Sequence, residues 1–474
     1  MTDLSLSRRA VLLGSLPAAC GLAQQPSRDP DTIDVRRFGA SPAASALDNS
    51  RAFAAASAAI NAAGGGTLLV PPGIYRVAAQ RLVGRRGAGR AFHSADIIKI
   101  ERCTRPVLIS GKGATLRAAD GLRYGSFDPQ TGAPHKPASL PFYDRDFRTD
   151  PYRMIEVNEC RGAVRIEGFD LDGNMKAYVL GGEWGDTGRQ LSAVGIMLQG
   201  NVGGVTIEGV TSHDHGLDGI MVVHHGLGPR SPRYPITLID VVCDRNGRQG
   251  LSWVGGTELT ALRCRFTRTG RGKVSSAPGA GVDIEAENSV CRNGRFVDCE
   301  FSDNAGVGFL ADQGDTANVR LERCTFVGTT AWSAWPRKPG FVFDDCLFVG
   351  AIVQTHGDPD PRRAVRFQSC RFRADRALSP TRAVYGSTLA DLGAGATNVL
   401  FTGCSFEAII PEVALPWTPG DVRYDNCRFR QAGKVTSYPR GVFTGRCEIV
   451  SAGHVQLEGS RFAGHVTLNG RKLS

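Results

Sequence analysis

The sequence predicts an all-β solenoid, in which short strands stack coil upon coil and one α-helix covers the N-terminal end. Two repeats predict it. A glycine followed by alternating apolar residues occurs five times between positions 195 and 312, at intervals of 24, 31, 31 and 27 residues. A Cys-x-Phe pattern occurs seven times between positions 264 and 429. Repeats of this length are typical of solenoids, whose coils each bury one face against their neighbours.

The glycine-led repeats have the two-residue period of a β-strand, whose side chains alternate between two faces. We expect one face to pack in the interior, with the residues Ile196, Leu198, Ile220, Val222, Leu251, Trp253, Val282, Ile284, Phe309 and Ala311. The other face should point outward, with Met197, Gln199, Met221, Val223, Ser252, Val254, Asp283, Glu285, Leu310 and Asp312.

The Cys-x-Phe repeats predict a second interior ladder, because residues two apart on a strand point to the same side. The copies begin at Cys264, Cys299, Cys324, Cys346, Cys370, Cys404 and Cys427. Cysteine packs as a small hydrophobic residue, so each coil should contribute one thiol and one ring to the core. No Cys-x-x-Cys or histidine pairing accompanies these cysteines, and their regular placement argues against both disulfides and a metal site.

The first 23 residues resemble a bacterial twin-arginine export signal, because Arg8-Arg9 precedes a short apolar run that ends at Leu22. This implies a periplasmic or secreted protein, and residues 24–30 then form a linker. The alternative is an ordinary cytosolic N-terminal helix. The chain has no apolar run long enough to span a membrane.

The segment 31–77 predicts an N-terminal cap. Residues 32–38 are expected to form a strand, and an Ala-rich helix should span 51–63, with its N-cap among 48–50 and its end at Gly64-Gly65-Gly66. Such a helix would shield the apolar cross-section of the first coil from water.

The motifs Phe38-Gly39-Ala40, Gly64-Gly65-Gly66-Thr67 and Pro71-Pro72-Gly73-Ile74-Tyr75 resemble the opening of the pectate-lyase-like superfamily. That resemblance implies a right-handed parallel β-helix with an N-terminal capping α-helix. Residues 31–474 would then form a single domain. It says little about chemistry, because one fold hosts many reactions.

The charge of the chain favours an anionic partner. There are 56 Lys and Arg residues against 46 Asp and Glu residues, a net charge of +10. Since no basic block interleaved with aromatic residues appears, nucleic acid is not expected. The partner we expect is a polysaccharide, with the protein a monomer.

Acidic residues on the outward face give the sharpest candidate for catalysis. Asp283 and Glu285 lie two residues apart on one face, and Asp312 follows about one coil later. Paired carboxylates suit acid–base chemistry or glycoside hydrolysis, and close carboxylates raise one another's pKa. The alternatives are a structural network of ion pairs and a Ca²⁺ site; otherwise no cofactor is expected.

The turns before the strands add further candidates. Arg248 could clamp a sugar carboxylate, and His213 or His215 could act as a base. Substrate-binding candidates come from the same turns and from the long segments beside them: Asn246, Gln249, Asp218, Tyr178, Trp184 and Arg271. Each has a purely structural alternative, such as a histidine or asparagine that bonds to the backbone of a turn.

Three of these turns also resemble successive coils of the mannuronan C5-epimerases: Leu171-Asp172-Gly173-Asn174, His213 to Gly219, and Asn246-Gly247-Arg248-Gln249-Gly250. Members of that family carry Asp-Pro-His-Glu where this chain has Ile196-Met197-Leu198-Gln199, and Arg-His where it has Arg248-Gln249. The resemblance implies a shared scaffold with Arg248 as a carboxylate binder. It argues against epimerisation of alginate by that family's machinery.

Three functions follow as hypotheses. The first is lyase-type or epimerase-type chemistry on a uronate-containing polysaccharide, with Arg248 on the sugar carboxylate and a histidine or carboxylate taking the C5 proton. The second is a glycoside hydrolase that uses Asp283, Glu285 and Asp312. The third is a non-catalytic carbohydrate-binding or adhesive protein in which the acidic residues are structural.

Overall fold

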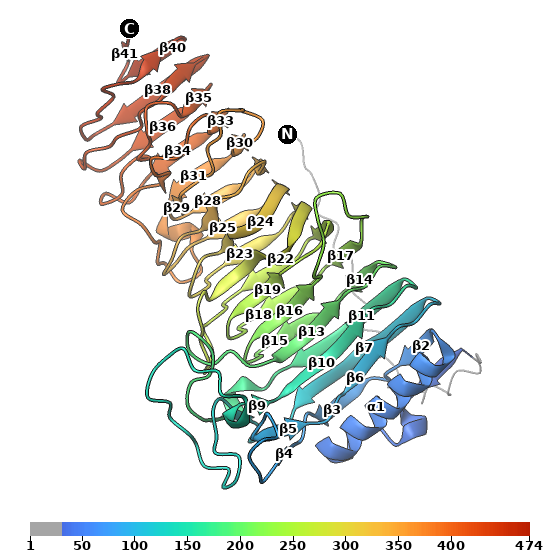
Figure 1. The fold of residues 1–474 in the computed structure, drawn as a ribbon. Coiled ribbons are helices and arrows are strands. Elements are labelled where there is room, and N and C mark those ends of the chain that lie inside the picture. Colours follow the sequence, from blue (N-terminus) through green and yellow to red (C-terminus); the bar gives the residue numbers. More distant parts are fainter. Residues whose placement is uncertain (1–30) are drawn as a thin grey trace, which may run out of the picture.

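The structure is a computed structural model and describes residues 31–474. The predicted export signal (1–23) and linker (24–30) lie outside the described residues. The chain forms a right-handed parallel β-helix, as predicted, with α1 (Ala46–Ala63) at its N-terminal end (Figure 1). Most coils contribute one strand to each of three parallel sheets, which we number in the order in which a single coil passes through them.

Sheet I holds the glycine-led strands. Its members are β6 (Ile98–Glu101), β10 (Tyr152–Asn158), β13 (Ala193–Gln199), β16 (Asp218–Val223), β19 (Gln249–Trp253), the first parts of β22 (Ala280–Val297) and β24 (Phe309–Glu322), β26 (Ala334–Pro336), β29 (Ile352–Val353) and β32 (Ala390–Asp391).

Sheet II follows after a turn. Its members are β1 (Thr32–Asp34), β2 (Gly66–Leu69), the first parts of β7 (Val107–Ala118) and β11 (Val164–Asp172), β14 (Val205–Glu208), β17 (Pro235–Ile239), β20 (Glu258–Leu262), the last parts of β22 and β24, β27 (Val342–Asp344), β30 (Arg366–Gln368), β33 (Leu400–Thr402), β35 (Arg423–Asp425), β37 (Val442–Thr444) and β39 (Arg461–Phe462).

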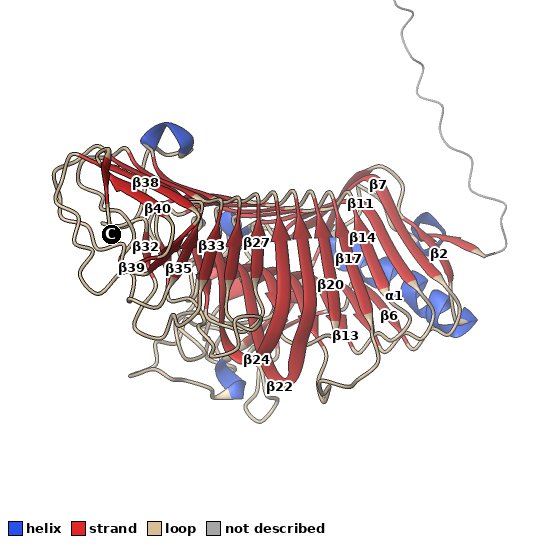
Figure 2. Cartoon of the chain, turned by 90° about the horizontal axis from the view of Figure 1, so that it is seen from above, coloured by secondary structure: helices blue, strands red, loops and turns tan. Residues whose placement is uncertain are grey.

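Sheet III completes each coil. Its members are β3 (Gly73–Val77), the last parts of β7 and β11, β15 (Thr211–His213), β18 (Val242–Asp244), β21 (Arg265–Thr267), β23 (Glu300–Ser302), β25 (Thr325–Val327), β28 (Leu347–Val349), β31 (Arg371–Ala374), β34 (Ser405–Ala408), β36 (Arg428–Gln431), β38 (Arg446–Ser451) and β40 (His465–Leu468). The strands stand in rows along the long axis (Figure 2).

Smaller elements decorate this stack. Strand β41 (Arg471–Lys472) pairs antiparallel with β40 at the C-terminal end. Outside the three sheets lie β4 (Gln80–Leu82), β5 (Phe92–Ser94), β8 (Arg123–Tyr124), β9 (Thr149–Asp150) and β12 (Val179–Leu180), together with the short 3-10 helices η1 (Val35–Phe38), η2 (Arg145–Phe147), η3 (Met175–Ala177) and η4 (Arg376–Leu378). No helix among residues 31–474 is long and apolar enough to cross a membrane.

The predicted interior face of sheet I is confirmed. Ile220 pairs in register with Ile196 on one side and Leu251 on the other, and the row continues through Val282 to Phe309. All ten predicted interior residues are buried. Residues of one type therefore lie above one another coil after coil, which is how a solenoid builds a continuous core.

The predicted ladder of thiols and rings is also confirmed. The rings of Phe326, Phe348 and Phe372 stack at centroid distances of 4.7 and 4.8 Å. The twelve described cysteines are buried and free of disulfides. Their sulfurs lie near backbone carbonyls, as Cys346 Sγ does 3.4 Å from the Leu321 oxygen. A parallel ladder in sheet II, which includes Phe343 and Phe367, packs edge-on against the first.

The cap differs from its prediction in two details. Only Thr32–Asp34 is a strand, because the Asp34 side chain accepts from Arg36 N and turns the chain into η1. Helix α1 starts at Ala46 rather than Arg51, since Ser45 is the N-cap and bonds Asp48 N. The helix ends, as predicted, at Gly64, whose φ of 71° lies in the left-handed region.

Candidate functional site

Five polar side chains gather on the outer side of sheet I, where β16, β19 and β22 run side by side. We call them the carboxylate cluster: Asp218, Arg248, Gln249, Asp283 and Glu285. Register brings them together, because Asp218 pairs with Gln249 and Ser252 pairs with Asp283. The outer face is nonetheless partly covered, and Asp218, Gln249, Ser252 and Asp283 have no exposed surface. This corrects the expectation that all outward positions face solvent.

Asp283 is the innermost carboxyl group of the cluster. Gln249 Nε2 donates to its Oδ2 at 2.6 Å, and its Oδ1 has no hydrogen-bond partner among the described residues. Burial, with the negative charge of Glu285, raises the pKa of Asp283 well above its ordinary value, although Arg248 opposes the shift. The environment of Asp283 therefore favours its protonated form over its carboxylate form.

Glu285 reaches the surface of the cluster. Its Oε2 lies 3.4 Å from Nη2 of Arg248, and its side chain keeps 13% of its surface exposed. Arg248 is itself mostly buried and faces the carboxylates of Asp218, Glu285 and Asp283. Because the Glu285 carboxylate already pairs with the guanidinium, Arg248 serves to orient Glu285 in this arrangement.

Asp312 adds a partly exposed carboxyl group at the edge of the cluster. Burial and the charge of Glu285 raise its pKa, while Lys338 and Arg337 lower it. Burial in turn lowers the pKa of Lys338, whose Nζ donates to the Gly314 carbonyl oxygen. Neither cation was predicted from the sequence, because both follow the short strand β26, which lacks the glycine-led pattern. They come near Asp312 because β26 pairs with β24, which carries Asp312.

Asp218 makes the stability of the fold depend on pH. Burial, with a smaller effect from Glu285, raises the pKa of Asp218 to about 7 against the opposing effect of Arg248, and neither carboxylate oxygen has a hydrogen-bond partner among the described residues. Between the ordinary value for aspartate, about 3.9, and about 7 the folded state holds a proton that the unfolded chain has lost. The free energy of unfolding therefore decreases as the pH rises through this window.

We expect Asp218→Asn to remove that loss, which amounts to about 1.4 kcal/mol per pH unit within the window. Urea denaturation of the variant and the wild-type protein at pH 5 and pH 8 measures it. The free energy of unfolding of the variant, relative to that of the wild-type protein, should be higher at pH 8 than at pH 5. An identical difference at both pH values would show that Asp218 has an ordinary pKa in the folded state.

The two candidate histidines lie away from the cluster. His213 is on sheet III, where its Nδ1 lies 2.7 Å from Asp214 and its Nε2 lies 3.1 Å from Asp170. Burial lowers its pKa, but the two carboxylates outweigh burial and raise the pKa to about 10. His215 points into the core beside Tyr152, and burial lowers its pKa to about 3. The structure therefore does not bring either imidazole to the carboxylate cluster.

The remaining candidates support turns and loops in this structure. Asn246 is buried, and its amide bonds Ser212 O and His215 N. Tyr178 is buried with its hydroxyl 2.7 Å from that of Tyr152. Trp184 donates to the Asp144 carbonyl oxygen, and Arg271 bonds Asp303, Thr329 and Thr330. Of the predicted substrate-binding residues, the structure thus brings only Gln249 and Asp218 into the cluster.

A Ca²⁺ site was an alternative for Asp283 and Glu285, and it stays a prediction. Among residues 31–474, one group places three ligand atoms within 4.8 Å of one another: Asp172, His213 and Asp214. Its charges are already compensated, since Arg245 binds Asp214 at 2.6 Å and Arg117 lies 3.6 Å from Asp172. The three residues therefore belong to a network of ion pairs in this structure.

No protein-family model and no curated protein sequence matches this chain. Solved structures do resemble it. The A-module of the mannuronan C-5 epimerase AlgE4 of Azotobacter vinelandii is 14% identical, with a TM-score of 0.43, over 92% of this chain and 99% of that one. An exopolygalacturonase of Thermotoga maritima is 12% identical, with a TM-score of 0.34, over 95% and 94%. Pectate lyase Pel9A is 15% identical, with a TM-score of 0.34, over 86% and 72%.

Proposed function

We propose that the protein is a carbohydrate-active enzyme that hydrolyses glycosidic bonds of a polysaccharide at the carboxylate cluster. The observation that carries this proposal is that the surroundings of neighbouring carboxyl groups differ. Glu285 is ion-paired with Arg248, whereas its neighbours Asp283 and Asp312 have raised pKa values. Glycosidases need such a pair, one carboxylic acid to protonate the leaving oxygen and one carboxylate as base or nucleophile.

Exposure assigns the roles within the cluster. Asp312 and Glu285 are both partly exposed, so in this proposal Asp312 is the acid and Glu285 the base or nucleophile. Asp283 has no exposed surface and acts as a positioning residue, since its raised pKa favours a carboxyl group that adds no second charge near Glu285. Gln249 holds Asp283, and Arg248 holds Glu285.

Elimination or epimerisation of a uronate polymer is the second candidate. Two cations, Arg337 and Lys338, lie close enough to Asp312 to lower its pKa, and they could receive a sugar carboxylate. The lowered pKa of Lys338 would also suit a base. Hydrolysis ranks first because the histidines proposed as bases lie away from the cluster and Arg248 is already paired with Glu285.

One assay separates the candidates. The protein is incubated with a panel of neutral and acidic polysaccharides, and new reducing ends are measured together with the ultraviolet absorbance of unsaturated sugar ends. Hydrolysis gives reducing ends without that absorbance, and elimination gives both. Altered stereochemistry by NMR without cleavage indicates epimerisation. Binding without turnover across the panel would refute the enzymatic proposal and leave a carbohydrate-binding protein.

A further inference from the structure

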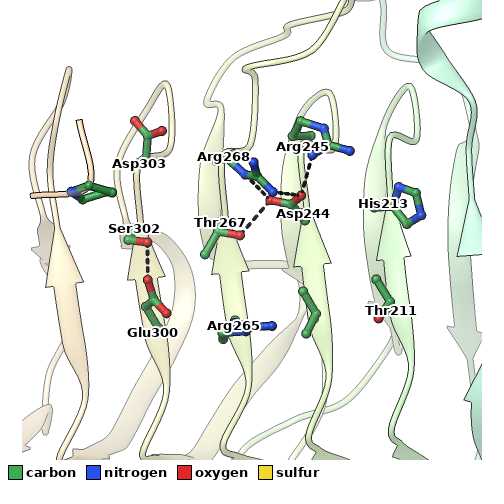
Figure 3. Close-up of a pocket in the computed structure, with 12 residues that line it drawn as sticks. Thr211, His213, Asp244, Arg245, Arg265, Thr267, Arg268, Glu300, Ser302 and Asp303 are labelled. Atoms are coloured by element: carbon green, nitrogen blue, oxygen red, sulfur yellow. Dashed lines mark hydrogen bonds and ion pairs between the residues drawn. The ribbon is translucent and has the colours of Figure 1, made fainter. Parts of the chain in front are cut away.

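A hollow of about 490 Å³ lies on the outer face of sheet III, away from the carboxylate cluster on sheet I. Strands β15, β18, β21 and β23 form its floor (Figure 3), and Pro380 of the long segment after β31 lines it. Since sheet III forms a different face of the coil, this hollow is distinct from the carboxylate cluster.

Among the described residues that line this hollow, Arg265 is the arginine without a side-chain partner. Two other arginines that line it are engaged: Arg245 with Asp214 and Asp244, and Arg268 with Asp244. Arg265 is exposed, and its guanidinium has no hydrogen bond or ion pair with any residue of the described chain 31–474. Its neighbour in register, Glu300, instead accepts from Ser302 Oγ at 2.5 Å (Figure 3).

The other lining groups suit a sugar. Thr211 offers a hydroxyl group on the same row of the floor, two strands from Arg265 across Val242. The carboxylate of Glu300 can accept from sugar hydroxyls. Val242 and Pro380 supply apolar surface for the C–H faces of a pyranose ring. A planar guanidinium binds a carboxylate through two parallel hydrogen bonds.

We propose that this hollow is a second carbohydrate-binding site, which takes an acidic sugar residue with Arg265 bound to its carboxylate. It would hold an acidic polymer on a face of the coil remote from sheet I. This inference does not depend on catalysis at the carboxylate cluster, because a site on sheet III can bind whether or not Glu285 and Asp312 act.

Calorimetric titration of the full chain tests the proposal, with a uronic-acid oligosaccharide as the probe and its neutral methyl ester as the comparison. All proteins carry Glu285→Gln to prevent turnover. We expect Arg265→Ala to weaken binding of the acidic probe at this site by about tenfold or more, the effect of losing a charge-assisted hydrogen-bonded pair. The methyl ester should bind weakly to both proteins.

Arg371→Ala is the matched control. Arg371 lies in the same row of sheet III, four coils further on, and is likewise exposed without a side-chain partner among the described residues. An equal loss in both variants would show diffuse charge attraction and overturn the site. So would equal binding of the ester, absence of binding by the parent protein, or displacement of the probe by inorganic sulfate at matched concentration. Turnover of polysaccharide by the protein with Glu285 intact is read separately, so the two proposals fail independently.

Discussion

Replacing Glu285 by glutamine is expected to lower the rate of polysaccharide hydrolysis by about 10²- to 10⁴-fold, the contribution typical of a positioned acid or base. Glutamine keeps the shape of the side chain but can neither accept the proton nor act as the nucleophile. It also ends the ion pair that holds Glu285 3.4 Å from Arg248. Initial rates on the polysaccharide that the panel identifies measure the effect.

Glu287→Gln is the matched control for this prediction. Glu287 lies two residues further along β22, carries the same chemistry and is exposed. We expect this variant to keep the wild-type rate. The single variant Asp312→Asn, like Glu285→Gln, should lose activity. Full activity in Glu285→Gln, or equal losses in both glutamate variants, would remove the carboxylate cluster from the mechanism.

Truncating one ring of the sheet III ladder should produce the largest loss of stability. Phe348 stacks on Phe326 and Phe372 at 4.7 and 4.8 Å, and meets Phe343 and Phe367 edge-on. Phe348→Ala leaves a cavity that a rigid stack fills poorly, so we expect the free energy of unfolding to fall by about 3–5 kcal/mol. Urea denaturation followed by circular dichroism measures it.

The comparison for that variant is Phe38→Ala, since the Phe38 ring is 39% exposed. It removes the same number of atoms from a surface position, where little buried contact is lost. A loss in Phe348→Ala no larger than that in Phe38→Ala would show that the ladder contributes little to stability.

The repeats made the core predictable. A period of two assigns each residue of a strand to a face, and stacking repeats that assignment in every coil. The interior positions of sheet I and the Cys-x-Phe ladder therefore appear in the structure as the sequence predicts. The carboxylate cluster follows from the same rule, because Asp283 and Glu285 share the outward side of one strand.

The turns were not predictable in this way. Asp214 and Arg245 have positive φ values, 56° and 49°, in the turns between sheets III and I. Such a residue breaks the alternation of side chains, so the direction of the next residue cannot be carried across the turn. This is why His213 and His215, two residues apart, lie in different surroundings, and why the turn residue Asn246 points inward.

The buried thiols of the ladder can report which coils of the protein have unfolded. From Cys324 to Cys447 each successive coil buries one cysteine, and a buried thiol does not react with an alkylating reagent. A solenoid opens coil by coil, because each coil contacts only its neighbours. The mass added by brief alkylation would thus count the coils that have separated. The positions of the labelled peptides would show from which end the stack unfolds.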